Sequence, residues 1–501
     1  MNIIEAIENE NVFKPRFKDP ATWRSWTVFL KALFGLPIED QADLELFRTC
    51  TGLAEPPKER IKECTAICGR RSGKSYISAL VAVYLATLKD WTPYLNRGER
   101  GLIFIVAVDR PQARIVKDYV SGILDETPIL RKLIKEDKKE EIILKNGVSI
   151  EIKTNSYRSI RGFTCLAAVL EETAFWRSEL TANPDREVIN ALRPAMATIP
   201  DSLLISISTP YSRRGFLYDT YKESFGQVGQ TFVWKAPSLV MNPTLDTELI
   251  KKALRADPAE AEAEWMVEWR ADVASFLPFE AIQACVVTDR TELPPLEGER
   301  YTAFIDPSLG GQDSFTLAIA HGEADGQLRI LDLVREIKPG FNPEDAVADI
   351  AAVAKSYRCF EVISDRFLLD WVTTEFERHG VRVKKSPKNV SEIYLDFIPL
   401  ITSRAVELLD DRRIIGQIGN LERRARTGGH DLVTHFSGQH DDLANAVAGV
   451  LCFCGKRFGS VCTTLIEEDR EKREEEARLN GSGESAYGKI GVGFRKFYGR
   501  Y

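Results

Sequence analysis

The stretch "CGRRSGKS", Cys68 to Ser75, stands between the apolar run "CTAI" and the apolar segment "YISALVAVYLATL". It matches the phosphate-binding consensus G-x-x-x-x-G-K-[ST] except at the first position, where Cys68 replaces glycine. A small residue suits that position if the backbone there needs no positive φ. In such a loop, backbone N–H groups surround phosphates, the lysine neutralises charge and the hydroxyl binds Mg²⁺. The predicted residues for ATP and Mg²⁺ are Gly69, Arg70, Arg71, Ser72, Gly73, Lys74 and Ser75.

Two acidic residues, Glu171 and Glu172, end the later apolar run "LAAVLEE". In a nucleotide-hydrolysing site the first acid would hold the hydration shell of Mg²⁺, and the second would orient and deprotonate the attacking water. Two acids after a buried strand can also be a plain solvated terminus, so this prediction depends on the loop at residues 68–75. The run "SLLISISTP" ends in Ser208 and Thr209, small hydroxyls that we expect near the γ-phosphate.

Residues 61–240 alternate short apolar runs with amphipathic segments. The runs "CTAIC", "GLIFIVAV", "CLAAVL" and "SLLISIS" are typical of buried parallel strands, and "DRPQARIVKDYVSGIL" is typical of a helix. "EIILKNGVSIEIKT" predicts a hairpin with Asn146-Gly147 as a type I′ turn. This alternation favours a doubly wound α/β domain.

Four segments in this order resemble the ATPase half of the large terminase subunit of tailed bacteriophages: "GRRSGKS", "AVDRPQARIV", "SIRGFT…VLEETAFW" and "ISTP". The resemblance implies that Glu172 is the catalytic glutamate, whereas Glu171 stands where the family usually has Asp. The other implied roles are ATP–Mg²⁺ binding by Lys74 and Ser75, and coupling of hydrolysis to motion by Ser208 and Thr209.

Arginines near these motifs are further candidates, because a guanidinium beside the γ-phosphate stabilises the transferring charge. Arg70 and Arg71 lie in the loop itself and are candidates for sensing the nucleotide. "YRSIRGFT" supplies Arg158 and Arg161 ahead of the acidic strand. The resemblance implies an arginine finger that acts on a neighbouring subunit's ATP, and Arg161 is the closest match for this catalytic role.

The second half of the chain places acids at strand ends and at a helix start, as cleavage of a phosphodiester with two metals requires. They are Asp306 in "AFIDPS", Asp365 in "VISDRF" and the pair Asp441-Asp442 in "HDDLANA". We predict that all four bind Mg²⁺ or Mn²⁺ and that Asp306, Asp365 and Asp442 are catalytic. Taken singly, each Asp also suits a cap or a strand end, Asp441 above all as an N-cap.

The expected element order around these acids is ribonuclease H-like: three strands, a helix, a strand and a late helix. The same block resembles the terminase nuclease half, where "HDDLANA" matches the third acidic motif. Asp313 is a candidate supporting ligand. His435 and His440 flank the motif and are candidates to tune it, although ordinary surface histidines are the more common case. Arg423, Arg424 and Arg426 in "LERRARTGGH" are placed to contact phosphates near the cut.

The overall composition argues against a membrane protein, a disulfide-rich protein and a general nucleic-acid binder. The 501 residues are 44% hydrophobic, and apolar runs stay shorter than the roughly 18 residues that a membrane span needs. Nine scattered cysteines favour reduced thiols over a disulfide framework or a structural zinc. The net charge of −7 is not that of a general nucleic-acid binder, so DNA contacts must come from local basic patches.

Together these patterns predict an α/β chain in which a P-loop ATPase domain of the RecA/ASCE type precedes a ribonuclease H-like nuclease domain. We expect Trp23, Trp26, Leu30 and Phe34 to form one apolar stripe in the first region, and a long helix at about 390–410 in the nuclease domain. The predicted regions are a helical lead-in (1–60), the ATPase domain (61–240), a connector or subdomain (241–297), the nuclease domain (298–457) and a disordered tail (458–501).

The resemblance implies an ATP-driven motor that packages double-stranded DNA into a procapsid and cuts concatemeric DNA. Its implied partners are the portal protein, a small terminase subunit and further copies of the chain in a ring, without a membrane. The implied location is the host cytoplasm, on procapsids and not in the mature virion. Two alternatives remain: a DNA helicase or repair translocase with an accessory nuclease, and a structural protein that keeps an ATPase fold without turnover.

Overall fold

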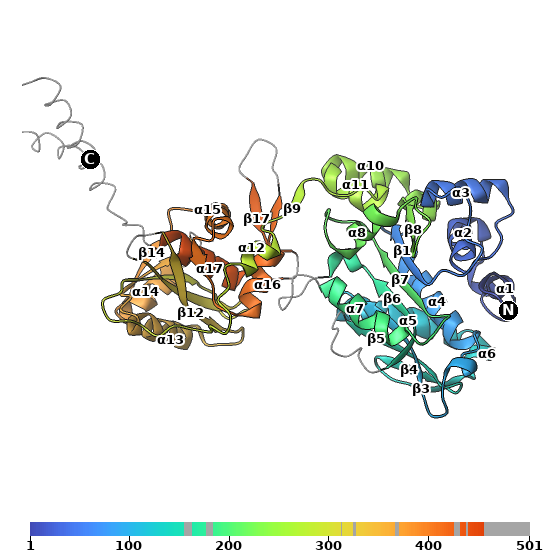
Figure 1. Cartoon of the computed structure of the whole chain (residues 1–501), viewed down its shortest axis with the longest axis horizontal. Coiled ribbons are helices and arrows are strands. Elements are labelled where there is room, and N and C mark those ends of the chain that lie inside the picture. The colour runs from blue at the N-terminus through green and yellow to red at the C-terminus, as the bar shows by residue number, and fades with distance from the viewer. Residues whose placement is uncertain are drawn as a thin grey trace, which may run out of the picture.

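The computed structural model of the chain describes residues 1–154, 163–176, 184–311, 313–323, 327–365, 370–424, 431–436 and 439–454. These residues form two α/β lobes that lie side by side, each built on its own sheet (Figure 1). Within the described residues, no helix is both long enough and apolar enough to cross a bilayer. The predicted tail from residue 458 onward lies outside the described residues.

The first lobe contains an eight-stranded sheet in the order β3-β4-β5-β2-β6-β7-β1-β8. All pairs from β5 to β8 are parallel, and the β3-β4 and β4-β5 pairs are antiparallel. The strands are β1 (Glu63–Cys68), β2 (Gly101–Ala107), β3 (Ile134–Asp137), β4 (Glu141–Leu144), β5 (Val148–Thr154), β6 (Thr164–Glu171), β7 (Leu203–Ser208) and β8 (Thr231–Ala236). One strand, β7, separates the loop strand β1 from the acidic strand β6, as in RecA/ASCE ATPases, so the predicted fold of this lobe is confirmed.

Both faces of this sheet are covered, which explains why its strands read as continuous apolar runs. Along β2, Ile103 and Ile105 pack with helices α4 and α5, whereas Phe104 and Val106 pack with α7. The helices of this lobe that follow β1 are α4 (Lys74–Thr87), α5 (Arg110–Asp125), α6 (Pro128–Arg131), α7 (Pro184–Met196) and α8 (Gly215–Ser224).

The N-terminal region is helical, and its apolar stripe belongs to the core of the first lobe. Trp26 and Leu30 are buried, and the Phe29 and Trp234 rings pack edge to face with centroids 5.6 Å apart. Trp23 and Phe34 pack against the same core from partly exposed positions. The helices are α1 (Ile3–Glu8), α2 (Arg24–Leu33) and α3 (Gln41–Thr51).

The β4-β5 hairpin forms as predicted, but its turn type differs. A type I′ turn needs positive φ at both central residues, and of the pair Asn146-Gly147 only Gly147 has a positive φ (83°). The strands are joined by the three residues 145–147, with the glycine in the left-handed position. The Asn146 side chain instead donates to the carbonyl oxygen of Ala86 (2.8 Å), which fixes the hairpin to α4.

The predicted connector divides between the lobes. Helices α9 (Ser238–Met241), α10 (Thr247–Ala256) and α11 (Pro258–Met266) stay with the first lobe, and Gly69 of the loop packs against Ser238. In contrast, β9 (Val273–Ser275) pairs with β16 (Glu422–Arg424) of the second lobe, and Phe276, Leu277 and Ile282 enter that lobe's core. The second lobe therefore begins near residue 273 and not at 298, because a strand partner and a core lie on that side.

The second lobe contains a six-stranded sheet in the order β14-β13-β10-β11-β12-β15. β10, β11 and β12 are antiparallel neighbours, and β13 and β14 continue in parallel from β10, which is the ribonuclease H-like order. The strands are β10 (Tyr301–Asp306), β11 (Phe315–Gly322), β12 (Arg329–Ile337), β13 (Glu361–Ser364), β14 (Arg382–Lys385) and β15 (Val406–Glu407), with β16 (Glu422–Arg424) and β17 (Leu432–Thr434) beside β9. The predicted fold class is confirmed here too.

Its helices are α12 (Phe279–Gln283), α13 (Pro343–Ser356), α14 (Asp370–Arg378), α15 (Val390–Thr402), α16 (Arg412–Asn420) and α17 (Asp442–Phe453). The helix predicted to run to about residue 410 ends at Thr402. Arg404 takes a left-handed conformation (φ 55°), and Ala405 N–H bonds to the carbonyl oxygen of Leu400 (2.9 Å). This is a Schellman ending, in which Arg404 occupies the position that glycine usually signals.

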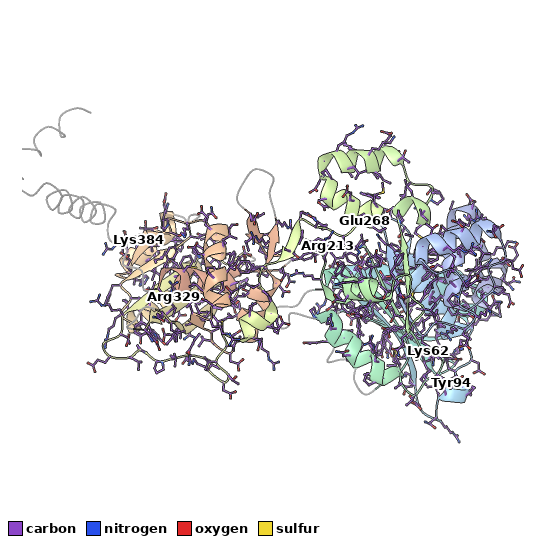
Figure 2. All side chains as sticks on the ribbon, turned by 45° about the horizontal axis from the view of Figure 1, so that its top comes forward. Lys62, Tyr94, Arg213, Glu268, Arg329 and Lys384 are labelled. Atoms are coloured by element: carbon purple, nitrogen blue, oxygen red, sulfur yellow. The ribbon has the colours of Figure 1, made fainter. Side chains whose placement is uncertain are left out.

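Helix α17 is buried along its whole length and crosses β10. The approach is close because residue 449 is glycine: a Cβ there would lie 2.6 Å from ring atoms of Phe304. Two residues further along, Arg329 of β12 donates to the carbonyl oxygen of Leu451 (2.6 Å), and Figure 2 labels this arginine within the second lobe. The C-terminal half of the helix that begins at Asp442 is thus fixed against β10 and β12.

We expect Gly449→Ala to destabilise the second lobe by about 1–3 kcal/mol, because the added methyl group has no space against the buried Phe304 ring. Calorimetry of the full chain would show a lower midpoint for that lobe. Gly122→Ala in α5 is the matched control, since nothing lies within 4 Å of a Cβ there and the change should stabilise by about 0.4–1 kcal/mol. An unchanged midpoint in Gly449→Ala would contradict the packing.

Candidate functional site

The order β6-β7-β1 brings three of the predicted motifs to one edge of the first sheet. The three strands are parallel, so the segments that follow them lie at the same end. These segments are the loop after Cys68, the acids Glu171 and Glu172, and the pair Ser208–Thr209. The sheet thereby brings together residues that are up to 141 positions apart in the sequence (68 to 209).

The loop backbone shows why Cys68 can replace the first glycine. Cys68 is the last residue of β1, is fully buried and has no positive φ. The following Gly69 cannot be replaced so easily, because a Cβ would lie 2.2 Å from Ser238 Oγ. Arg71 and Gly73 take positive φ angles of 60° and 93°, so the loop reverses at these two residues.

The Lys74 ammonium is buried and contacts all three motifs. Its Nζ donates to Thr209 Oγ1 (2.7 Å) and to the carbonyl oxygens of Cys68 (3.2 Å) and Gly69 (3.1 Å). It also forms an ion pair with Glu172 Oε1 (3.3 Å). A phosphate bound in the loop would compete with these contacts for the lysine.

Glu172 is held in a strained conformation at the end of the acidic strand. Its φ of 53° and ψ of 43° are left-handed, which is uncommon for a non-glycine residue and is concentrated at functional sites. Its Oε2 accepts from Ser208 Oγ (3.2 Å) and from the Thr209 backbone N–H (3.1 Å). The predicted base is therefore linked to the predicted coupling residues by direct hydrogen bonds.

Glu171 and Ser75 form the part of the site that suits Mg²⁺. Ser75 Oγ donates to Glu171 Oε2 (2.7 Å), so the glutamate reaches the loop hydroxyl although the family usually has the shorter Asp. Burial raises the pKa of Glu171 above its ordinary value. Its Oε1 is buried and has no hydrogen-bond partner among the residues that the structure describes. A buried carboxylate oxygen of this kind fits a hard cation.

Of the predicted arginines, Arg70 is turned toward helix α11. Its guanidinium pairs with Glu264 Oε1 (2.6 Å), and its backbone N–H bonds to the Glu264 carbonyl oxygen (2.6 Å). Arg71 is exposed, and its carbonyl oxygen accepts from Asn242 Nδ2 (2.9 Å). Arg158 and Arg161 lie outside the described residues.

Two residues near the loop were not predicted as part of the site. Trp26 Nε1 donates to the carbonyl oxygen of Ser72 (2.6 Å), so the stripe assigned to the core also supports the loop. Gln112 Nε2 lies 3.1 Å from Ser75 Oγ and 3.3 Å from Glu171 Oε2. The only sequence signal for Gln112 is its place in "AVDRPQARIV".

In the second lobe, Asp306 and Asp365 end neighbouring parallel strands. The register pairs Ile305 with Ser364, so the next residue on each strand is an aspartate, and adjacent strands lie about 4.8 Å apart. Asn445 of α17 donates to Asp306 Oδ2 (2.9 Å), and Asn445 Oδ1 is buried with no hydrogen-bond partner in the described parts of the chain. Asn445 is an oxygen ligand candidate that sequence analysis missed.

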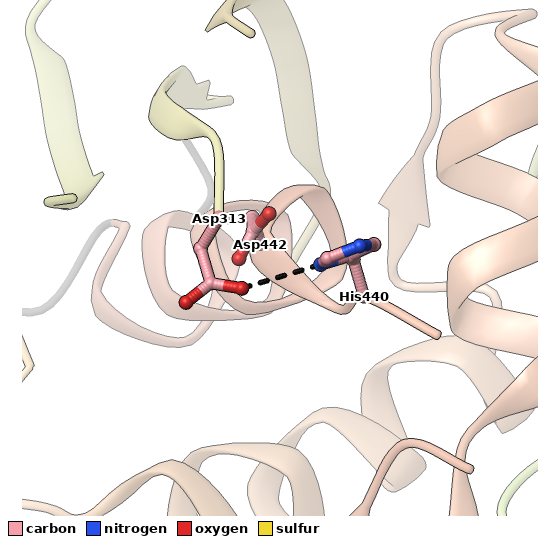
Figure 3. A group of neighbouring side chains, drawn as sticks. All are labelled: Asp313, His440 and Asp442. Carbon is pink, nitrogen blue, oxygen red and sulfur yellow. Dashed lines mark hydrogen bonds and ion pairs between the residues drawn. The ribbon is translucent and has the colours of Figure 1, made fainter. Parts of the chain in front are cut away.

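Asp442, the first residue of α17, lies close enough to Asp306 for its charge to act on that acid. Its Oδ2 accepts from the Ser314 backbone N–H (3.0 Å). Ligand atoms of Asp313, His440 and Asp442 all lie within 4.8 Å of one another (Figure 3). His440 Nδ1 is 3.2 Å from Asp313 Oδ1, so of the two interpretations of this histidine the structure favours contact with the acidic motif.

Asp441 occupies the N-cap position of α17, yet its side chain makes no capping hydrogen bond. It accepts from Tyr394 OH (2.9 Å) and lies 3.8 Å from His435 Nε2. The capping interpretation is therefore wrong for its side chain, which contacts Tyr394 and His435 instead.

These acids are close enough to raise one another's pKa. Burial and the charges of Asp442, Asp365 and Asp441 raise the pKa of Asp306 well above its ordinary value. Burial, together with Asp313 and Asp441, raises the pKa of Asp442 to about 6. Carboxylates that raise one another's pKa in this way gain from a divalent cation between them.

A buried contact joins the two lobes beside the first site. Glu422 of β16 is fully buried and accepts from Tyr211 OH (2.8 Å) and Arg214 Nη2 (2.8 Å) of the first lobe. The Tyr211 and Phe436 rings pack edge to face with centroids 5.4 Å apart. Arg424 Nη2 lies 3.3 Å from Tyr211 OH, so this arginine joins the contact.

The other members of the predicted basic run are placed differently. Arg423 forms an ion pair with Asp431, and Arg426 lies outside the described residues. The role of this run in phosphate contact therefore stays a prediction.

No protein-family model matches the chain, and no curated protein matches it. Among solved structures, the chain is similar to the large terminase of bacteriophage HK97, at 16% identity over 86% of this chain and 99% of that chain with a TM-score of 0.36. It is similar to the large terminase of a thermophilic bacteriophage in complex with ADP, at 12% identity over 80% and 95% with a TM-score of 0.31. The large terminase nuclease of thermophilic phage G20c with bound magnesium matches at 16% identity over 34% and 95% with a TM-score of 0.30. At these identities and scores the likeness assigns no activity to this chain.

Proposed function

We propose that this chain is a large terminase subunit, an ATP-driven motor that moves double-stranded DNA into a procapsid and cuts concatemeric DNA. One observation carries the proposal: a phosphate loop bonded to an acid pair and a cluster of carboxylates stand on two sheets of one chain. The first arrangement suits hydrolysis of a nucleoside triphosphate, and the second suits phosphodiester cleavage.

In the ATPase step, Lys74 would leave its carbonyl and carboxylate partners for phosphate oxygens. Glu172 would then be free to accept the proton of the attacking water. Because Glu172 also accepts from Ser208 and Thr209, the change would reach the end of β7 directly. Mg²⁺ held by Ser75 and Glu171 would supply neutralising charge to the phosphates.

In the nuclease step, Asp306, Asp365 and Asp442 would hold Mg²⁺ or Mn²⁺, with Asp441, Asn445 and the Asp313–His440 pair around them. The bound ions would stabilise the negative charge that develops at the cleaved phosphate. Ser314 N–H and Asn445 Nδ2 each hold one acid in place, which keeps the cluster in position without the ions.

We further propose that the active form is a ring of copies on the portal vertex in the host cytoplasm, fed with DNA by a small terminase subunit. A finger in trans from Arg161 would need such a neighbour. The observation that supports a finger from another copy is that Arg70, the arginine inside the loop, already forms an ion pair with Glu264.

The two alternatives fit less well. A helicase would have a second RecA-like domain, whereas the second lobe has a ribonuclease H-like sheet. A structural protein without turnover would have no need of the linked set Lys74, Glu172 and Thr209.

For the ATPase, we expect Lys74→Ala and Glu172→Gln to lower the rate of ATP hydrolysis about 10²- to 10⁴-fold, because each removes a charge or a base from the reacting centre. A phosphate-release assay on the purified chain measures this. Lys251→Ala, an exposed lysine of α10, should hydrolyse at the wild-type rate. Wild-type turnover in Lys74→Ala would exclude this site.

For the nuclease, Asp306→Asn and Asp365→Asn should abolish Mn²⁺-dependent cleavage of plasmid DNA, because each removes a metal ligand. Asp349→Asn, an exposed aspartate of α13, and Lys74→Ala should both still cleave. Cleavage that persists in both of the first two variants would show that another site cuts.

Asp306→Asn should also change stability in a metal-dependent way. An acid whose pKa is raised by folding destabilises the folded state near neutral pH, so the neutral amide should raise the melting temperature of the metal-free protein. Mg²⁺ should raise the melting temperature of the wild-type chain and have a smaller effect on the variant. A lower metal-free melting temperature with an unchanged Mg²⁺ effect would contradict the cluster.

A further inference from the structure

Gln112 connects the two groups that are expected to receive Mg²⁺. It stands in the first turn of α5, whereas Ser75 is in the first turn of α4 and Glu171 ends β6. Gln112 Nε2 lies 3.1 Å from Ser75 Oγ and 3.3 Å from Glu171 Oε2, and those two oxygens are 2.7 Å apart. Three elements therefore meet in one triangle of polar atoms.

The local helix geometry offers Gln112 a different partner, which it does not use. Asp109 is the N-cap of α5, and its side chain accepts from the backbone N–H of Gln112 (2.8 Å). A glutamine at this third helical position typically reaches back to the N-cap backbone N–H, completing a capping box. Here its carboxamide donates across to Ser75 and Glu171, so its placement serves the site and not the helix end.

The hydrogen bonds of Ser75 fix the orientation of its hydroxyl group. A serine hydroxyl has one donor and two acceptor positions. The donor goes to Glu171 Oε2, and Gln112 N–H occupies one acceptor position. One lone pair of Oγ is left over, in a rotamer fixed from two sides. Glu171 Oε1 is buried without a hydrogen bond of ordinary geometry in the described residues, and it is a second candidate oxygen, with the Ser78 hydroxyl close enough to the carboxylate to lower its pKa.

We infer that Gln112 is a positioning residue for the Mg²⁺ that accompanies the nucleotide. Its N–H group holds the Ser75 hydroxyl and the Glu171 carboxylate in the orientation that receives the ion. The extra methylene that Glu171 has over an aspartate adds a rotatable bond, and the contact with Gln112 restrains it. This inference rests on the proposed ATP–Mg²⁺ function of the loop.

The test is nucleotide binding with and without Mg²⁺, which separates positioning of the ion from a general structural role. Gln112→Met keeps the length of the side chain and removes its donor. We expect its affinity for a fluorescent ATP analogue in EDTA to stay within about twofold of wild type. The Mg²⁺ concentration for half-maximal enhancement of binding should rise about 3- to 10-fold, as loss of one hydrogen bond implies.

Arg114→Met is the matched control, because it makes the same side chain at an exposed position of the same helix. It should show wild-type binding in both conditions, and the melting temperature of each variant should match that of the wild type. An unchanged Mg²⁺ requirement in Gln112→Met would overturn the inference while leaving the proposed function intact. A wild-type chain that binds no nucleotide would overturn both.

Discussion

The first site depends on a buried ammonium group. A buried cation must be paired, and in this chain Lys74 takes its partners from all three strand ends: two loop carbonyls, Thr209 and Glu172. The same contacts hold the predicted base beside the predicted coupling hydroxyl. A phosphate bound in the loop would compete with these partners for the three donors of the lysine.

The end of β7 also lies close to the other lobe. Tyr211 follows Thr209 by two residues and bonds to the buried Glu422, which sits on the strand that pairs with β9. Burial and Glu422 raise the pKa of Tyr211 to about 12, so the phenol stays a hydrogen-bond donor across the physiological range. The loop and the second lobe are therefore connected by the Lys74–Thr209 hydrogen bond, two residues of chain and the Tyr211–Glu422 hydrogen bond.

Much of the fold follows from patterns that report burial. Continuous apolar runs identified the parallel strands, and acids at the ends of such runs identified Glu171, Glu172, Asp306 and Asp365. Positions where the backbone departs from its usual residue were missed. Arg404 ends a helix in a glycine-like conformation, and the β4-β5 turn uses Gly147 alone.

The sequence could not predict which residues far apart in the chain contact one another. Nothing in "QARIV" says that Gln112 meets a serine 37 residues earlier, and nothing in the connector says that β9 pairs with β16. His440 and Asn445 entered the acidic cluster because helix α17 crosses β10 at Gly449. Such placements depend on packing between elements, which single-residue patterns do not encode.

We propose that one chain holds two separate metal-dependent centres for phosphate chemistry. Anomalous diffraction from crystals of the full chain grown with Mn²⁺ and a non-hydrolysable ATP analogue tests it most directly. We expect Mn²⁺ between Ser75, Glu171 and the analogue, and Mn²⁺ among Asp306, Asp365 and Asp442. Manganese at neither place, with the analogue absent from the loop, would contradict it.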